Sequence, residues 1–194
     1  MEILGDQKIA RLLTRRLWLL ALSLYALMAV GELSAQGFRE DQVKAAFIYN
    51  FAQFTEWPPD VFQQTNAPLF IGILGTNPFG EALEQTVRNE KVRGHPVLVK
   101  YCRTLAEAEK CHIVYISSSE AGSIEEIVAD LKGKPVLTVS DIENAAYRGV
   151  IIRLMTERNR VRFRINLEAA RAARLTLSSK LVNLAHSIIG REKQ

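Results

Sequence analysis

The sequence predicts an α/β fold, a three-layer domain in which helices cover both faces of a largely parallel central sheet. Short apolar runs suited to buried strands alternate with helical segments over residues 69–140. This alternation is typical of strand–helix–strand units joined by right-handed crossovers. Two further strand patterns flank residues 156–159, and a helical pattern ends the chain. We therefore expect a C-terminal antiparallel hairpin and helix to complete the domain.

The first 36 residues have the pattern of an export signal. Arg11, Arg15 and Arg16 precede the uncharged apolar run Leu17–Val30, and small residues follow up to Ala35. The apolar run is shorter than the ~20 residues that a membrane span requires. We expect a signal peptide over residues 1–36, cleaved near Ala35, and a periplasmic protein; the alternative is a retained membrane anchor. Residues 37–194 contain no repeat or linker, which predicts a single domain.

The charge balance argues against a nucleic-acid-binding protein. The leader holds four of the 25 basic residues and three of the 21 acidic residues, which leaves a net charge of +3. An excess this small does not make the basic footprint that nucleic acids require. We therefore expect no nucleic-acid partner.

The segment Lys44–Pro58 is expected to form the helix that opens the domain. Its apolar residues recur at helical spacing, at Val43, Ala46, Phe47, Phe51 and Phe54. Pro58 and Pro59 end the helix because proline has no amide hydrogen to donate.

This helix is apolar on more than one side, which indicates more than one neighbour. We expect Phe47, Phe51 and Phe54 to pack on the sheet. Ile48, Tyr49 and Trp57 then face outward and are the candidate contacts with a second molecule.

The other elements follow in order. Strands are expected over residues 69–75, 97–101, 112–117 and 136–140, and hairpin strands over 150–155 and 160–165. Helices are expected over 79–87, 105–110, 119–131, 167–173 and 178–189. Caps support three of the helix ends, namely Asn77 before Pro78, Ser119 at the start of its helix, and Gly133 with Pro135 after it. The last helix should bury Leu181, Leu184, Ala185 and Ile188.

Two sets of residues have local chemistry of interest. Cys102 and Cys111 form an even cysteine count in an exported chain, so either a disulfide or two half-buried thiols is consistent with the sequence. Small polar residues follow the expected strands, where α/β sheets commonly bind ligands. This candidate pocket consists of Thr76, Asn77, Ser118, Ser119, Ser140 and Asp141. The alternative is that these residues are ordinary helix caps and turn formers.

No catalytic set is visible in the sequence. The dinucleotide, phosphate-loop and nucleophile-elbow motifs are absent, and His95, His112 and His186 lack companions at metal-ligand spacing. We therefore expect no enzyme activity, no metal and no cofactor.

Alternate residues of the hairpin are arginines, namely Arg158, Arg160, Arg162 and Arg164. Alternation along a strand places side chains on one face. This face either protects a solvated sheet edge or binds an acidic partner or an anionic ligand.

Several segments together resemble the YfiR family (DUF4154) of periplasmic proteins. They are VKAAFIYNFAQFTEWP from Val43, GTNPFG from Gly75, VRGHP from Val92, CHIVYI from Cys111, PVLTVSD from Pro135, VRFRINL from Val161 and LSSKL from Leu177. The likeness covers nearly all of residues 40–190, and the order of the segments makes it specific.

The resemblance implies a non-enzymatic regulator. The founding protein represses an inner-membrane diguanylate cyclase through the periplasmic domain of the enzyme, and an outer-membrane lipoprotein sequesters it. It forms a homodimer and contains disulfides. Cys111 matches a family cysteine, but the first strand and the C-terminal segment lack the others. A bond between Cys102 and Cys111 would thus be a local variant.

We expect a protein that binds and represses a membrane signalling partner and so modulates cyclic-di-GMP. The partner is the periplasmic domain of a diguanylate cyclase or a sensor kinase. The expected contacts are Ile48, Tyr49, Trp57, Arg160, Arg162 and Arg164. The alternative is a periplasmic sensor that binds a small ligand in the strand-end pocket.

Overall fold

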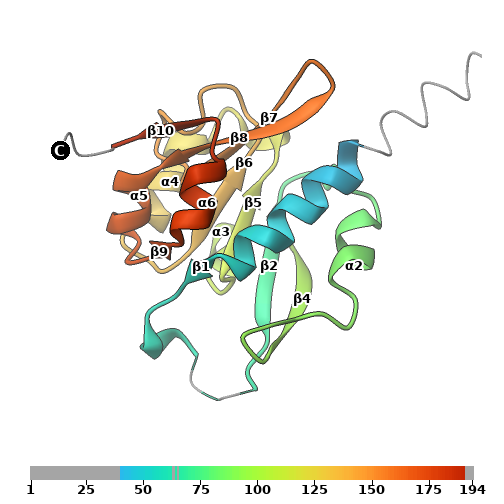
Figure 1. The fold of residues 1–194 in the computed structure, drawn as a ribbon. Helices are drawn as coiled ribbons and strands as arrows, with labels where there is room; N and C mark the ends of the chain where they lie inside the picture. The colour runs from blue at the N-terminus through green and yellow to red at the C-terminus, as the bar shows by residue number, and fades with distance from the viewer. Residues whose placement is uncertain (1–39, 63, 65, 191–194) are drawn as a thin grey trace, which may run out of the picture. The chain divides into compact units, whose positions relative to one another are not determined.

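The computed structural model describes residues 40–62, 64 and 66–190. The predicted signal peptide lies outside these residues. The described residues from Asp41 to Gly190 form one compact unit, and Figure 1 shows its arrangement. No helix among the described residues is long and apolar enough to cross a membrane.

Eight strands of the described residues form one sheet in the order β10-β8-β7-β6-β5-β2-β4-β3. The pairs are parallel except β7 with β8 and β3 with β4. The strands are β2 Leu69–Leu74, β3 Lys91–Val92, β4 His95–Cys102, β5 Ile113–Ile116, β6 Leu137–Ser140, β7 Ile152–Glu157, β8 Arg160–Asn166 and β10 Ser187–Ile189. This confirms the predicted α/β class with a mainly parallel sheet.

Helices cover both faces of this sheet. The opening helix covers residues 40–53. The others are α2 Ala82–Val87, α3 Leu105–Ala108, α4 Ile124–Leu131, α5 Leu167–Ala172 and α6 Ser179–Leu184, with short 3-10 turns η1 Pro59–Val61 and η2 Ser118–Glu120. One buried cluster joins the opening helix, α2, α5 and α6 to the sheet, and a second joins α3 and α4. The three-layer prediction is therefore confirmed.

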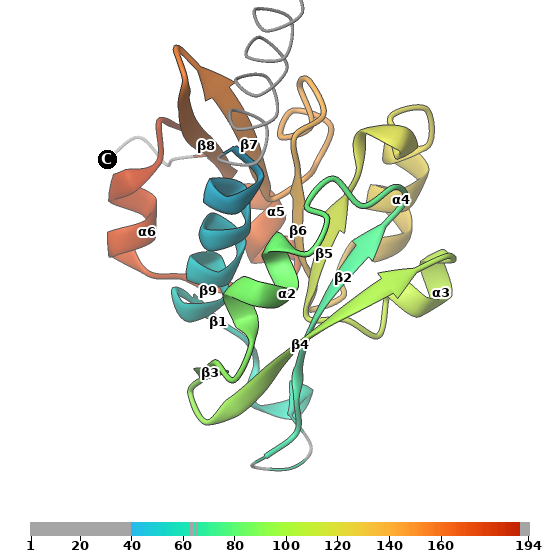
Figure 2. The ribbon, with the colours of Figure 1, turned by 90° about the vertical axis from the view of Figure 1, so that its right-hand side faces the viewer.

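The opening helix lies between α2 and α6, across the strands (Figures 1 and 2). Its buried residues are Ala45, Ile48, Phe51 and Ala52, which recur every three to four positions and so share one face. Phe51 packs edge-on against Phe163 of β8, with the ring centroids 5.2 Å apart. A small second sheet follows, because β1 Thr55–Glu56 pairs antiparallel with β9 Thr176–Leu177.

The prediction for the last helix was wrong over its second half. α6 begins as expected, because Ser178 accepts a hydrogen bond from the amide of Leu181, but it ends at Leu184. Leu184 is 69% exposed rather than buried. The chain then forms β10, whose Ile188 pairs with Ile165 of β8. Adding a parallel strand to the sheet edge gives these β-branched residues a better environment than another helical turn.

Two other helices begin later than predicted. α2 begins at Ala82, because the side chain of Asn77 accepts the amide of Phe79 in a local turn instead of capping a helix. α4 begins at Ile124 after the 3-10 turn η2, which Ser117 caps. In both places a polar side chain bonded to the nearby backbone favours a turn over helix initiation.

Candidate partner-binding surface

The hairpin of β7 and β8 contains five arginines, at positions 153, 158, 160, 162 and 164. Arg158 and Asn159 connect its strands, and both have positive φ, 51° and 58°. Two successive residues of positive φ form the type I′ turn that matches strand twist. The strands therefore run unbroken to Glu157 and from Arg160, so the first strand lies two residues further along the chain than predicted, at Ile152–Glu157 instead of 150–155.

The register places four arginines on one face of this hairpin. Arg153 lies opposite Arg164, Met155 opposite Arg162, and Glu157 opposite Arg160. Directly opposed residues point the same way, so all six side chains share a face, which we call the arginine face. Leu154, Phe163 and Ile165 point to the other side and belong to the core. The predicted alternation on one face is thus seen for Arg160, Arg162 and Arg164, but not for Arg158, which lies in the connecting turn.

Sequence reasoning missed Arg153, which belongs to this face. The predicted arginine repeat follows the chain from Arg158 to Arg164, whereas Arg153 lies on β7 and joins the face only through the pairing of the strands. Counting back from the Arg158–Asn159 turn would have found it, because a two-residue turn fixes which residues are opposed.

The positive charges of the arginine face are not balanced by nearby carboxylates among the described residues. Among the described residues, none of Arg153, Arg160, Arg162 and Arg164 forms an ion pair with a carboxylate. Arg162 contacts the ring of His186, with Nη1 and Nδ1 3.0 Å apart. The face can therefore attract an acidic surface.

The three candidate contacts on the opening helix and its end do not join this face. Ile48 is fully buried in the main core, so the expectation that it faces outward is wrong. Tyr49 is half-buried and donates a hydrogen bond of 2.7 Å to Glu90. Trp57 is also half-buried, and its ring nitrogen donates to the carbonyl of His112 at 3.3 Å. The second apolar side of the helix is thus covered largely by the domain itself.

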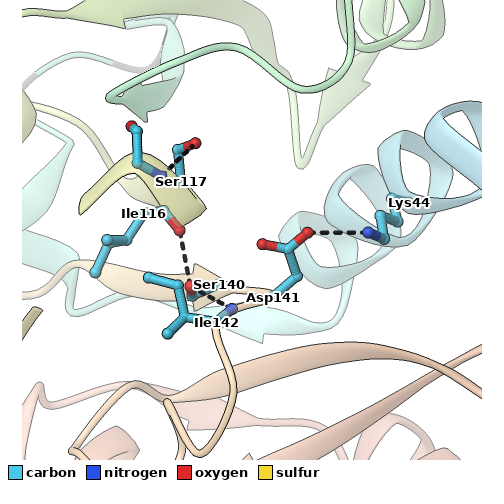
Figure 3. Close-up of polar contacts among 7 residues, drawn as sticks. Lys44, Ile116, Ser117, Ser140, Asp141 and Ile142 are labelled. Atoms are coloured by element: carbon cyan, nitrogen blue, oxygen red, sulfur yellow. Dashed lines mark hydrogen bonds and ion pairs between the residues drawn. The ribbon is translucent and has the colours of Figure 1, made fainter. Parts of the chain in front are cut away.

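The strand-end residues are bonded to one another and to nearby backbone. Ser140 is fully buried, donates to the carbonyl of Ile116 and accepts the amide of Ile142 (Figure 3). Asp141 forms an ion pair of 2.9 Å with Lys44 of the opening helix. These contacts fix the end of β6 and connect it to the opening helix. They agree with the alternative that the strand-end residues are ordinary helix caps and turn formers.

The other strand-end residues also form hydrogen bonds within the protein. Ser119 accepts the amide of Thr76 at 2.9 Å and donates to Glu120 at 3.2 Å. Gly75 has a φ of 89°, and a Cβ there would lie 2.4 Å from Ser119 Oγ and 2.8 Å from Glu120 Oε1. The carboxylate of Glu120 thus lies within the candidate pocket, with Ser118 exposed beside it, and this arrangement disfavours an anionic ligand.

A pocket of about 400 Å³ lies elsewhere, between α4 and α5. Two polar residues that line this pocket, Thr138 and Asn166, form hydrogen bonds within the protein. Thr138 accepts the amide of Ile151, and Asn166 bonds Ala146 and Ala169. Most of the remaining lining is aliphatic, and none of the six strand-end residues lines this pocket.

Cys102 and Cys111 meet across the central strand β2. Their sulphur atoms are 3.9 Å apart and carry free thiols. They meet because β4 and β5 both neighbour β2 and because Gly72 leaves the space between them open. Burial raises the pKa of Cys111 to about 12 and also raises the pKa of Cys102. Both thiols are therefore held in their protonated, weakly nucleophilic form.

His112 forms part of an aromatic stack at the amino end of β5. The ring of Phe62 lies between His95 and His112, at centroid distances of 4.0 and 4.6 Å. His112 Nδ1 accepts the amide of Phe70 at 3.0 Å, which requires an unprotonated nitrogen. Burial, aided by the charges of His95 and Lys100, lowers the pKa of His112 to about 4.

We expect the stability of the protein to fall as pH falls from about 6.5 to 4. The unfolded chain protonates His112 near pH 6.5, whereas the folded chain resists until about pH 4. The unfolded state therefore binds more protons in this window, which destabilises the fold by about 1–2 kcal/mol after allowance for partial exposure. Urea unfolding at several pH values measures this loss.

His112→Gln should lose less stability than wild type across that window, since glutamine does not titrate. His186→Gln is the matched control, because it removes an exposed histidine outside the Phe62 stack. Equal slopes for wild type and His112→Gln would contradict the assignment.

The described residues contain no group of three or more histidine, cysteine or acidic side chains that could hold a metal ion. The described residues thus combine an α/β domain, strand ends that are bonded within the protein, and an arginine face without a carboxylate partner. The chain belongs to the YfiR/HmsC-like family, whose profile matches residues 41–186. Members of this family are periplasmic regulators of cyclic-di-GMP signalling.

A solved structure is also similar to this chain. It is a conserved domain protein from Vibrio cholerae O1 biovar El Tor strain N16961, with 14% identity and a TM-score of 0.45. The match covers 61% of this chain and 54% of that protein, so this chain spans about half of its length. No curated protein matches the sequence.

Proposed function

We propose that this protein is an exported, non-enzymatic regulator that binds and represses the periplasmic domain of an inner-membrane diguanylate cyclase. Membership of the YfiR/HmsC-like family supports the signalling role. The observation that carries the binding role is the arginine face, which has no carboxylate partner among the described residues. The partner then presents an acidic surface to Arg160, Arg162 and Arg164.

Repression follows from holding the cyclase in a form that cannot signal, since a ligand shifts an equilibrium only towards the state it binds better. A sensor kinase is the alternative membrane partner. An outer-membrane lipoprotein that sequesters the regulator, and a homodimer of the regulator, belong to the same proposal. Tyr49 and Trp57 remain proposed contacts because both are partly exposed.

Removing the gene should raise cellular cyclic-di-GMP, and restoring it should lower the level again. The double variant Arg160→Gln/Arg162→Gln should fail to restore it. It should also bind the purified periplasmic domain of the cyclase about 10–100-fold more weakly, the effect of losing one or two charge-assisted contacts. Wild-type affinity should decrease as salt increases.

Arg88→Gln is the matched control, because Arg88 is exposed at the end of α2 and lies outside the arginine face. Unchanged cyclic-di-GMP after deletion would rule out the signalling role. Wild-type affinity in the double variant would instead rule out only the arginine face as the contact.

A further inference from the structure

Arg153 and Arg164 are paired in a way that costs energy. In the register of the sheet they form the centre of a row, Ser140–Arg153–Arg164–Ser187, across β6, β7, β8 and β10. Directly opposed residues of an antiparallel pair have Cβ atoms about 4.5–5.5 Å apart, and like charges at that distance repel. The row itself contains no carboxylate.

Nearby acidic groups do not compensate this pair. Glu157 lies at the far end of the hairpin, opposite Arg160. Asp141, which follows the Ser140 end of the row, forms its ion pair with Lys44. The two guanidinium groups therefore lack a counter-charge among the described residues.

The pair is nevertheless held in place. Arg164 Nε donates to Ser187 Oγ at 2.6 Å, and its guanidinium carbon lies 4.9 Å from the ring centre of Tyr147. These contacts fix the plane of the group and leave its outer nitrogens available. Arg153 Nε is buried and has no hydrogen-bond partner among the described residues. Leaving a buried donor unsatisfied is costly, so both arginines have donors suited to an incoming acceptor.

We propose that Arg153 and Arg164 form a binding site for a small oxyanion, a carboxylate or a phosphate group. Guanidinium groups bind such anions through two parallel hydrogen bonds, with a geometry that an ammonium group does not provide. The anion removes the repulsion between the arginines and accepts from their unused donors. Tyr147 is 64% exposed and borders the site. This inference goes beyond the regulatory role and does not depend on which protein is bound.

The test is thermal unfolding of the full chain in sodium phosphate or sodium acetate, each compared with sodium chloride at the same ionic strength. The bound anion should raise Tm by about 3–6 °C at a tenfold excess over its dissociation constant. A response to phosphate alone assigns a phosphate ligand, and a response to acetate alone assigns a carboxylate. No rise with either anion would overturn the proposal.

Arg164→Lys keeps the charge but loses the planar guanidinium group that can form two parallel hydrogen bonds. Most of the anion-dependent rise in Tm should therefore disappear. Arg158→Asn is the control, because it removes a charge from the same hairpin at a position of positive φ that asparagine tolerates. It should respond as wild type does, and an equal loss there would show non-specific charge and overturn the site. If Arg164→Lys does not fold, the NMR signals of the Nε–H groups of Arg153 and Arg164 in the wild-type protein test the site instead. They shift on titration with the active anion if the site exists and stay fixed if it does not.

Discussion

Replacing Ile48 with aspartate should unfold the domain. Ile48 has no exposed surface and lies in the main core with Phe51 and Ala52. The change removes apolar contacts and buries a carboxylate that has no positively charged partner. Burying an unpaired charge is among the most destabilising substitutions, so we expect a loss above ~4 kcal/mol. Urea unfolding, or the absence of soluble folded protein, measures this.

Ala46→Asp is the matched control for that experiment. Ala46 lies on the same helix but on its exposed side, so the change should alter stability by no more than about 0.5 kcal/mol. A folded Ile48→Asp protein with normal stability would mean that Ile48 faces outward, as first expected from the sequence.

Replacing Gly72 with valine should have the second largest effect. A Cβ at this position would lie 2.8 Å from Cys111 Sγ and 3.0 Å from Cys102 Sγ. The strand is central, with β4 and β5 on either side, so the backbone has little room to move. Overpacking of this kind costs about 1–3 kcal/mol or more, and chemical denaturation measures the loss.

The double variant Gly72→Ala/Cys111→Ala provides the control, because it separates crowding from loss of the glycine itself. Gly72→Ala alone should be destabilising, and Cys111→Ala should recover part of that loss by removing the nearest sulphur atom. A double-mutant cycle should therefore give a coupling of about 0.5–3 kcal/mol. Purely additive effects would show that the two side chains do not compete for this space.

The central part of the fold could be predicted because its signals are local. Each of β2, β5 and β6 is a short apolar run buried on both faces, the pattern expected of interior parallel strands. Polar side chains at the helix starts gave useful but imprecise limits. Ser178 did cap α6, whereas Ser119 bonded a neighbouring loop instead of starting α4.

Features that depend on distant pairing could not be predicted. Residues 187–189 continue a helical pattern in sequence, and only the adjacent edge of β8 makes them a strand. For the same reason the periodicity of the opening helix did not reveal that Ile48 is buried. Its aromatic residues suggested one stripe, but Ile48 lies on the buried face together with Ala45, Phe51 and Ala52, in the core cluster that includes the sheet.

The arginine face was predicted only in part, for a related reason. Alternation along β8 is a local signal and correctly grouped Arg160, Arg162 and Arg164. Arg153 joins them by strand pairing. The proposed oxyanion site therefore lies outside what a search along a single strand reveals.

The small sheet of β1 and β9 has a consequence for how the chain reaches its folded state. It joins Thr55 to Leu177, so one half of this contact is made early in synthesis and the other near the end. A chain that emerges from its N-terminus, across a ribosome or a membrane, cannot secure its opening helix until residue 177 has also emerged. Contacts this distant in sequence slow folding. We therefore expect the domain to remain open, and accessible to proteases and chaperones, until the segment around residue 177 has been delivered.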